Sequence, residues 1–438
     1  AMSLEEAKKV TAELAKAEYL PPPRSIKDVT EILDGKRAES LADIERLRAT
    51  ADAVPPDTTD ATELFDFYWL RADAAQLVGR SGQQIADLQV AVEHGRESFV
   101  VGRTKAEAFG RVLTGAASAQ WQVGSMLKSK VLLDEAMSVA GRSEFPESEQ
   151  LINLILLTHY YLFRDDLDKA ERSLDTANES WAKEAKNRPY WPVEAWDEMQ
   201  SQFFSTEAKL LSASGKLEEA EVLHRKAIEN FRRHKDVPNK ETHLIPKLNL
   251  RVYLWYLAAL GNNLVRQGRP VEAEINWREI IAESVRGFGR YSNVTADAAT
   301  GLARALLEQG RFDDAETLAE TTLEIWQTIQ APTSSVSLQQ TRRLLTDIWI
   351  LQEDWLGASR MFAEIEQGLA DDPESRQRFL DQNPGYALTL MNSGQAEHAR
   401  NVLTLAYETK RNSLGQKHQE TAELGALYAT VVQAAGEK

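Results

Sequence analysis

The stretch of sequence that decides the fold is Leu260-Gly261-Asn262-Asn263-Leu264-Val265-Arg266-Gln267-Gly268-Arg269-Pro270-Val271-Glu272-Ala273. It recurs, with its second glycine and its final alanine in place, at residues 302–315 and again at residues 386–399. Gly268 and Gly310 are 42 residues apart, Gly310 and Gly394 are 84 apart, and Gly394 and Gly436 are again 42 apart. A fixed period of this length predicts a repeat architecture instead of several separate compact domains.

Each copy of the repeat is typical of two amphipathic helices joined by a tight turn. Apolar residues on both sides of the glycine recur at three- and four-residue spacing, which is the period of a helix with one buried face. The glycine stands where the turn needs a positive φ angle, and the small residue five positions later marks where the second helix crosses close to the first. The same phase predicts eight units, with turn and crossing residues Gly79 and Gln84, Gly124 and Ser129, Asp165 and Ala170, Gly215 and Ala220, Gly268 and Ala273, Gly310 and Ala315, Glu353 and Ala358, and Gly394 and Ala399.

The sequence therefore predicts an all-α superhelix of about eight helix pairs over residues 61–438, behind an N-terminal helical segment and linker at residues 1–60. Pro21-Pro22-Pro23 breaks the N-terminal helices, and the loop at residues 55–60 ends the segment. We expect helix pairs near residues 61–98, 103–140, 147–181, 194–234, 244–288, 292–328, 334–369 and 375–412, with a terminal helix at 418–435. That helix is either a natural cap or the first half of a truncated ninth unit, and Ala1-Met2 looks like a cloning scar.

The composition excludes several classes of protein. A chain of 438 residues without cysteine has no disulfide, no Cys-ligated metal and no cysteine nucleophile. Its 67 acidic and 51 basic side chains give a net charge of −16, which argues against a nucleic-acid partner. The longest apolar run, residues 151–163, is too short to cross a bilayer, so we expect no membrane partner and a cytoplasmic protein.

Motifs for catalysis are scarce. The seven histidines never fall at the i, i+4 spacing that places two imidazoles on one face of a helix for a metal ion. Ser212-Ala213-Ser214-Gly215-Lys216 resembles a phosphate-binding loop only in part, because the earlier glycine is missing and a helical pattern precedes it. We therefore expect no enzyme, no cofactor and no metal site.

The repeat is similar to the tetratricopeptide repeat, most clearly at Ala208, Leu211, Gly215, Leu217, Ala220 and Ala227. Its 42-residue period resembles the kinesin-light-chain subtype, as does the joint Arg411-Asn412-Ser413-Leu414-Gly415-Gln416-Lys417-His418. The resemblance implies a right-handed α-α superhelix that serves as a protein-interaction scaffold. It says little about the particular partner, because the same fold serves many.

A second resemblance concerns the segment before the repeats. Residues 22–34, Pro-Pro-Arg-Ser-Ile-Lys-Asp-Val-Thr-Glu-Ile-Leu-Asp, are similar to the corresponding segment of bacterial proteins that join such a solenoid to a caspase-like CHAT peptidase. The resemblance implies that this chain is the sensor or regulatory part of such a protein, with an effector domain beyond residue 438. The alternative is a stand-alone receptor for a small peptide or metabolite.

The resemblance also implies where a ligand would bind, because such repeats use the concave groove lined by the first helix of each pair. The groove positions of the family fall on Trp121, His159, Lys209, Trp255, Asn262, Arg304 and Arg343. Tryptophan with arginine and an amide is typical of peptide-binding surfaces, so we expect a protein or peptide ligand. Trp121 and Trp255 are equally consistent with packing between units, and Ala258 stands where recognition of a free peptide C-terminus would want lysine.

Two long connections interrupt the array. The first holds four large aromatic side chains, Trp181, Tyr190, Trp191 and Trp196, and either carries function or packs onto the neighbouring repeat. The second runs from Phe231-Arg232-Arg233-His234-Lys235 to Lys247 and holds a basic cluster, which either meets an acidic partner or is a solvated helix end.

Overall fold

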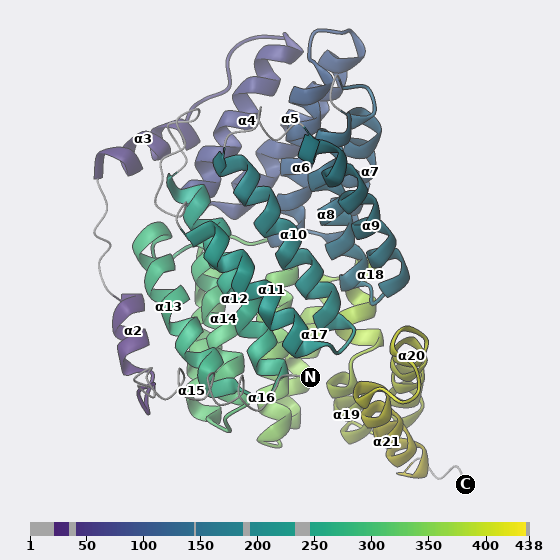
Figure 1. Ribbon diagram of the computed structural model, residues 1–438. Helices are drawn as coiled ribbons and strands as arrows, with labels where there is room; N and C mark the ends of the chain where they lie inside the picture. Colours follow the sequence, from purple (N-terminus) through teal and green to yellow (C-terminus); the bar gives the residue numbers. More distant parts are fainter. Residues whose placement is uncertain (1–21, 35–40, 144–145, 187–192, 233–245, 435–438) are drawn as a thin grey trace, which may run out of the picture.

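The computed structural model describes residues 22–34, 41–143, 146–186, 193–232 and 246–434, and over these residues the chain forms helices and no strand (Figure 1). This confirms the all-α fold. Consecutive helices pack in antiparallel pairs, because each has one apolar face and only a short turn before the next helix. The pairs then stack into a superhelix in which each first helix lies on the inner, concave side.

Within the described residues, eight helix pairs make up the superhelix. They are α4 (Ala61–Leu77) with α5 (Ser81–Val100), α6 (Ala106–Val123) with α7 (Met126–Ala140), α8 (Pro146–Phe163) with α9 (Leu167–Glu184), α10 (Val193–Ala213) with α11 (Leu217–Arg232), α12 (Pro246–Arg266) with α13 (Pro270–Phe288), α14 (Asn293–Leu307) with α15 (Phe312–Thr328), α16 (Val336–Leu351) with α17 (Trp355–Gly368), and α19 (Pro384–Asn392) with α20 (Ala396–Leu414). The helix α21 (Gln419–Ala434) packs on α20 at the end of the array.

The first helix of the eighth pair is broken. The four-residue helix α18 (Pro373–Arg376) runs into a π-helical turn, η2 (Gln377–Asp381), and the helix begins again at α19. The side chain of Asn383 caps α19, and Pro384 occupies its first turn, where its missing N–H costs nothing. The break displaces Arg378 from the phase that the other units share.

The turns between paired helices confirm the predicted backbone conformation with one exception. Five glycines, and Asp165 and Glu353 at the equivalent positions, have positive φ angles. Gly124 does not: its φ is −132°. Here Ser125 caps α7 directly after the glycine, and the Ser125 N–H donates to the side-chain oxygen of Gln120 at 2.9 Å. The five glycines are Gly79, Gly215, Gly268, Gly310 and Gly394, with φ between 71° and 80°.

The residue five positions after each turn is buried in every unit, and in seven of the eight units it is small. Six of these residues are alanines with 0% of their surface exposed, and Ser129 and Gln84 in the other two units are also buried. A larger side chain there would hold the two helices apart, so the small residue sets the distance at which a pair crosses. The six alanines are Ala170, Ala220, Ala273, Ala315, Ala358 and Ala399.

The superhelix returns on itself, so that its first units contact its last (Figure 1). The Ser125 hydroxyl donates to Asp372 at 2.5 Å, and Arg378 donates to the carbonyl of Phe163 at 2.6 Å. Further along, Lys410 Nζ lies 3.2 Å from a carboxylate oxygen of Asp165. Because two turns of the superhelix meet in this way, much of its concave face lies inside the molecule.

The N-terminal segment packs on two units of the superhelix, the fifth and the first. The helix α2 (Lys27–Asp34) packs on α13, where Arg278 donates to Asp28 at 2.5 Å, and buries Val29 and Leu33. The helix α3 (Leu41–Ala51) packs instead on α4. The segment therefore touches two helices that begin 209 positions apart in the sequence, at Ala61 and Pro270.

We predict that the turn glycines are needed for their backbone conformation alone. The Cβ of a Gly310→Ala variant would meet no atom within 4 Å, but φ is +73°, so we expect a loss of about 1–2 kcal/mol in the free energy of unfolding. Gly115→Ala is the control, because this exposed glycine lies inside α6 with equally open space and should gain up to about 1 kcal/mol. Urea unfolding measures both, and a gain in both would contradict the prediction.

We also predict that contacts between the two turns of the superhelix add stability. Asp372 and Asp354 each accept from a backbone N–H at the start of a helix, but only Asp372 also accepts from Ser125. Replacing a capping aspartate by alanine costs about 1 kcal/mol, and losing a buried hydrogen bond to a carboxylate costs about 2 kcal/mol more. Asp372→Ala should therefore lower the midpoint of urea unfolding clearly further than Asp354→Ala, and equal shifts would show that the contact contributes nothing.

Candidate functional site: the interior of the superhelix

The repeat places one side chain of each unit at the same point of the inner wall. The residue six positions before the turn residue lies on the concave side of the first helices, about one helical turn from the helix end. Over the third to seventh units this position holds polar or charged side chains. They are His159, Lys209, Asn262, Arg304 and Asp347.

The structure brings Trp121, His159 and Lys209 together from three successive units. The rings of Trp121 and His159 lie 6.1 Å apart between centroids, and Lys209 Nζ lies 3.4 Å from His159 Nε2. The hydroxyl of Thr206 is 3.2 Å from the same imidazole nitrogen. Trp121 also contacts Phe163 edge to face, so part of its ring packs between units.

Trp255 and Asn262 lie on one face of α12, and both are exposed. Trp255 keeps 39% of its surface accessible, which is high for a tryptophan in a folded chain. The guanidinium of Arg251, one helical turn earlier, lies over its ring at 5.0 Å from the centroid. Arg251 itself is only 4% exposed, and its Nε and Nη2 are buried with no hydrogen-bond partner in the described part of the chain.

Arg304 and Arg343 lie close together with a third arginine that the sequence did not indicate. The charge of Arg343 acts on both Arg304 and Arg378, lowering the pKa of each, although burial is the larger cause in both cases. Arg343 Nε is 3.9 Å from a carboxylate oxygen of Asp347, and Arg378 is 3.9 Å from Asp165. Three guanidinium groups from α14, α16 and η2 therefore converge on the same region.

Protein atoms surround these charges and change their acid–base properties. Burial lowers the pKa of Lys209 to about 8 and that of Arg251 to about 10. It also lowers the pKa of His159 well below its usual value, with Lys209 as the second cause, so the imidazole is neutral at pH 7. Burial raises the pKa of Asp297 to about 7, against the opposing effects of a hydrogen bond with Ser337 and the charge of Arg251.

The side chains of Lys209, Asp297, Arg304, Arg343 and Arg378 nevertheless remain partly accessible to solvent. Side chains that are strongly desolvated and yet partly accessible to solvent are typical of the walls of a recessed hollow. A hollow of about 510 Å³ lies at one end of this interior, between Arg343 and Arg378 on one side and α20 and α21 on the other. It is large enough to admit a few residues of a peptide.

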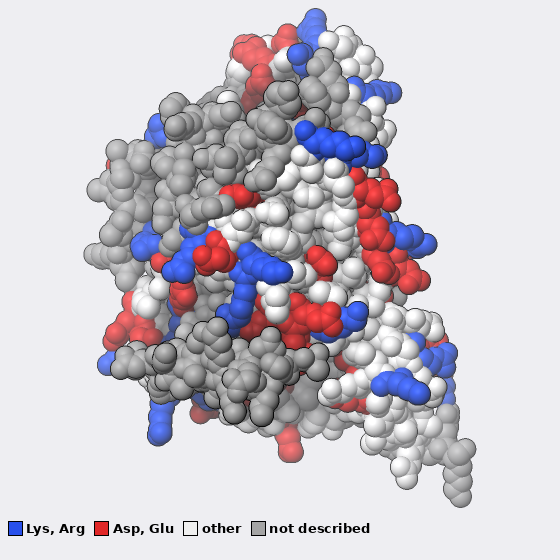
Figure 2. Space-filling model, in the orientation of Figure 1, with Lys and Arg blue, Asp and Glu red and all other residues white. Residues whose placement is uncertain are grey.

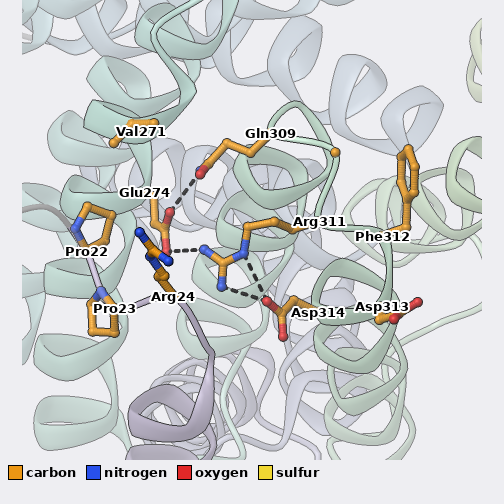
Figure 3. Close-up of a pocket in the computed structure, with 11 residues that line it drawn as sticks. Pro22, Pro23, Arg24, Val271, Glu274, Gln309, Arg311, Phe312, Asp313 and Asp314 are labelled. Carbon is orange, nitrogen blue, oxygen red and sulfur yellow. Dashed lines mark hydrogen bonds and ion pairs between the residues drawn. The ribbon is translucent and has the colours of Figure 1, made fainter.

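A second hollow, of about 600 Å³, lies outside the superhelix where the N-terminal segment meets α13 and α15 (Figure 3). Figure 3 shows Pro22 and Pro23 on one wall, with Glu274 and Arg311 between them and Phe312. Glu274 has no exposed surface, and it accepts from Gln309 at 2.8 Å and from Arg311 at 3.0 Å. Its charged groups already neutralise one another, so this hollow offers less to a ligand than the interior does.

The first long connection is described only in part. Trp181 and Trp196 stack with their ring centroids 4.0 Å apart, and Trp181 also stacks on Phe203. These two tryptophans thus pack α9 against α10, whereas Tyr190 and Trp191 lie outside the described residues. Most of the basic cluster of the second connection, residues 233–245, also lies outside them.

Two searches of the described residues concern other classes of site. The described residues hold no group of three histidine, aspartate or glutamate side chains that could bind a metal ion. Among the same residues, every helix is too short or too polar to span a membrane.

The helix pairs and the concave interior define the class of protein as an α-helical solenoid. Residues 252–328, which cover the fifth and sixth pairs, match the family model of the tetratricopeptide repeat. The match identifies tetratricopeptide repeats in this part of the chain, and the described residues have the architecture of a tetratricopeptide-repeat superhelix. The kinesin-light-chain subtype and the CHAT association stay predictions.

Solved structures of similar fold are numerous. One is a Rap protein complexed with Competence and Sporulation Factor, which is 11% identical, with a TM-score of 0.50, over 87% of this chain and 100% of its own. Another is NprR in complex with its cognate peptide NprX, which is 13% identical, with a TM-score of 0.47, over 87% and 99%. No curated protein sequence matches the chain.

Arg251, Asp297, Asp347 and Arg378 are interior residues that sequence reasoning missed. Three of them had a signal, because each shares a helix face with a predicted residue: Arg251 is four residues before Trp255, Asp297 is seven before Arg304, and Asp347 is four after Arg343. Arg378 had no such signal in the sequence. It lies in the π-helical turn, where the spacing of the repeat no longer predicts which side chains face the interior.

We predict that Asp297 makes the stability of the fold depend on pH. The folded protein raises the pKa of this carboxyl from 3.8 to about 7, so the stabilising contribution is full below pH 4 and is lost as the pH rises to 7. Asp297→Asn cannot ionise and should flatten the fall in melting temperature between pH 4 and pH 7. Asp313→Asn, at an exposed position on α15, should follow the wild-type profile; identical profiles for all three proteins would contradict the prediction.

Proposed function

We propose that this chain is a non-catalytic scaffold that binds a protein segment or peptide in the interior of its superhelix. The observation that carries the proposal is the exposed pair Trp255 and Asn262 on the inner face of α12, between Lys209 of the preceding unit and Arg304 of the next. A flat apolar ring and an amide suit a peptide, because the ring packs on a side chain while the amide pairs with the backbone. A Rap protein of the same fold, complexed with Competence and Sporulation Factor, supports this reading.

The site residues predicted from the sequence do not all support this proposal in the same way. Lys209, Asn262, Arg304 and Arg343 present polar atoms to the interior. Trp121 and His159 are tied to each other and to their neighbours, so we assign them to the wall that supports the site. The stand-alone receptor and the CHAT-associated sensor would use the same surface, and the CHAT role rests on the sequence of residues 22–34 alone.

Peptide selection tests the proposal directly. A display library of random linear dodecapeptides is selected on the immobilised chain, and recovered peptides are synthesised with a fluorophore for anisotropy titration. We expect Asn262→Ala to weaken their binding about tenfold without changing the melting temperature, since Asn262 is exposed and its amide is worth roughly 1–1.5 kcal/mol. Asn178→Ala, on the outer helix α9, is the matched control and should bind like the wild type.

Two results would contradict the proposal. One is the recovery of no binding peptide from the library. The other is equal binding by the wild type and the Asn262→Ala variant, which would place the bound peptides outside the interior.

A further inference from the structure

A hollow at the place where the superhelix closes on itself is lined by charges of both signs. Its volume of about 510 Å³ is in the range of small-molecule sites, roughly 300–1,000 Å³. Its walls come from the turn of the third unit, from the seventh and eighth units and from α21, so the hollow exists only because the two turns of the superhelix meet. The charged side chains that line it are three cations and three carboxylates: Arg343, Arg378, Lys410, Asp165, Glu420 and Glu423.

Half of these charges neutralise one another. Lys410 Nζ lies 3.2 Å from a carboxylate oxygen of Asp165 and 3.1 Å from one of Glu420. Arg266, which lies outside the lining, forms a second ion pair with Glu420 at 3.0 Å. Lys410, Asp165 and Glu420 therefore hold the closed superhelix together and offer little to a ligand.

The two arginines on one wall keep unused donors. Arg343 Nε is buried without a hydrogen-bond partner in the described part of the chain, and Asp347 lies 3.9 Å from it. Arg378 donates to the carbonyl of Phe163 at 2.6 Å but reaches Asp165 only at 3.9 Å. An arginine has five N–H donors, so both guanidinium groups have several left for a ligand.

The surroundings of these arginines are desolvated without being strongly cationic. Burial lowers the pKa of both Arg378 and Arg304, and the charge of Arg343 lowers both further. Four carboxylates act in the opposite direction, Asp165 and Glu420 on Arg378, and Asp347 and Glu308 on Arg304. With these carboxylates so near, the hollow has no excess of charge that would favour a simple anion.

The opposite wall presents a carboxylate beside an apolar surface. Glu423 on α21 is exposed, accepts from the side chain of Gln419 at 2.8 Å, and has no cation within 4 Å among the described residues. Leu424 and Leu427 of the same helix line the hollow and are only half-buried. This wall therefore suits a cationic group that is attached to an apolar side chain.

We propose that the hollow binds a small zwitterion with an aliphatic side chain, namely a free amino acid or a dipeptide. Its carboxylate accepts from Arg343 and Arg378, and its ammonium group donates to Glu423. Its side chain packs on the two leucines of α21, which buries apolar surface of both. The ligand thus supplies each unpaired charge of the two walls with a partner and adds no net charge.

Other small ligands fit this hollow less well. A dianion such as phosphate would meet the three carboxylates of the lining, and Figure 2 shows further acidic side chains gathered along the edge of α9, the helix that follows Asp165. A polyamine would meet the two arginines. An uncharged sugar would leave the charges of both walls desolvated and unpaired, which costs free energy.

This site is separate from the surface that we propose for peptides. That surface is centred on Trp255 and Asn262 of α12, and among the described residues no side chain of α12 lines the hollow. The inference therefore goes beyond the proposed function and does not depend on it.

Isothermal titration calorimetry of the full chain with matched ligands tests the inference. The ligands are L-leucine, L-leucyl-L-leucine, N-acetyl-L-leucine, which lacks the ammonium group, and L-leucinamide, which lacks the carboxylate. We expect at least one of the two zwitterions to bind at least about tenfold more tightly than either blocked analogue, because each analogue loses a charged hydrogen bond. Binding of L-leucine alone would identify a free amino acid as the ligand, and binding of the dipeptide alone would identify a short peptide.

Two variants locate the binding site. Glu423→Gln removes the partner of the ammonium group, so the affinity for the zwitterion should fall to that for N-acetyl-L-leucine. Arg343→Gln weakens the carboxylate end, so it should lower the affinity for the zwitterion but leave that for L-leucinamide unchanged. Glu408→Gln, at an exposed site on α20, is the control and should bind like the wild type.

Three results would each overturn the inference. They are the absence of binding by both zwitterions, equal binding of the zwitterions and the blocked analogues, and an unchanged preference for the zwitterion in Glu423→Gln. Because Glu423 is exposed, this variant keeps the test decisive even if Arg343→Gln does not fold. None of these results bears on peptide binding, which is measured with other ligands and with Asn262→Ala.

Discussion

The close crossing of the two helices within each pair is the constraint on which the rest of the structure depends. An alanine with no exposed surface marks the crossing in six of the eight units, and a residue in the left-handed conformation turns the chain five positions earlier. Together they fix both the distance and the angle between helices. Because each unit repeats the same geometry, small rotations add up, and the superhelix closes until its first units touch its last.

That closure explains the electrostatics of the interior. The first helices would line an open groove in a shallower superhelix, and water would solvate their charges. Here the second turn packs against the first through contacts such as Ser125 with Asp372, so Lys209 and Arg251 are surrounded by protein and their pKa values fall. The cost of desolvating them is a consequence of the curvature.

Much of the fold was predictable from the sequence, because the repeat is local. Turn, crossing residue and helix face follow from a 42-residue phase, and even Asp165 and Glu353 were placed in left-handed turns without a glycine to mark them. The positive φ angle predicted for Gly124 was wrong. The neighbouring Ser125 and Gln120 form a different helix end at this turn, which the repeat pattern does not encode.

The interior was less predictable, because it depends on contacts between distant units. The repeat phase places Arg304 and Arg343 on concave faces, but it carries no information on how tightly the superhelix closes or on which charges remain unpaired. Arg378 approaches the same region only through the π-helical turn before Asn383. The packing of residues 22–34 on α13 was also not predictable from the sequence, because no periodic pattern links segments that are 250 positions apart.

The packing of α2 on α13 has a consequence for how the protein folds. In an ordinary solenoid each unit contacts only its neighbours, so stability accumulates along one dimension and the ends can fray alone. Here α2, the middle units and the last units are joined across the superhelix by Arg278 with Asp28, Arg378 with Phe163 and Lys410 with Asp165. Contacts between residues so far apart in the sequence raise the contact order and are expected to slow folding. They also couple the ends of the array to its centre, so we expect the array to unfold cooperatively.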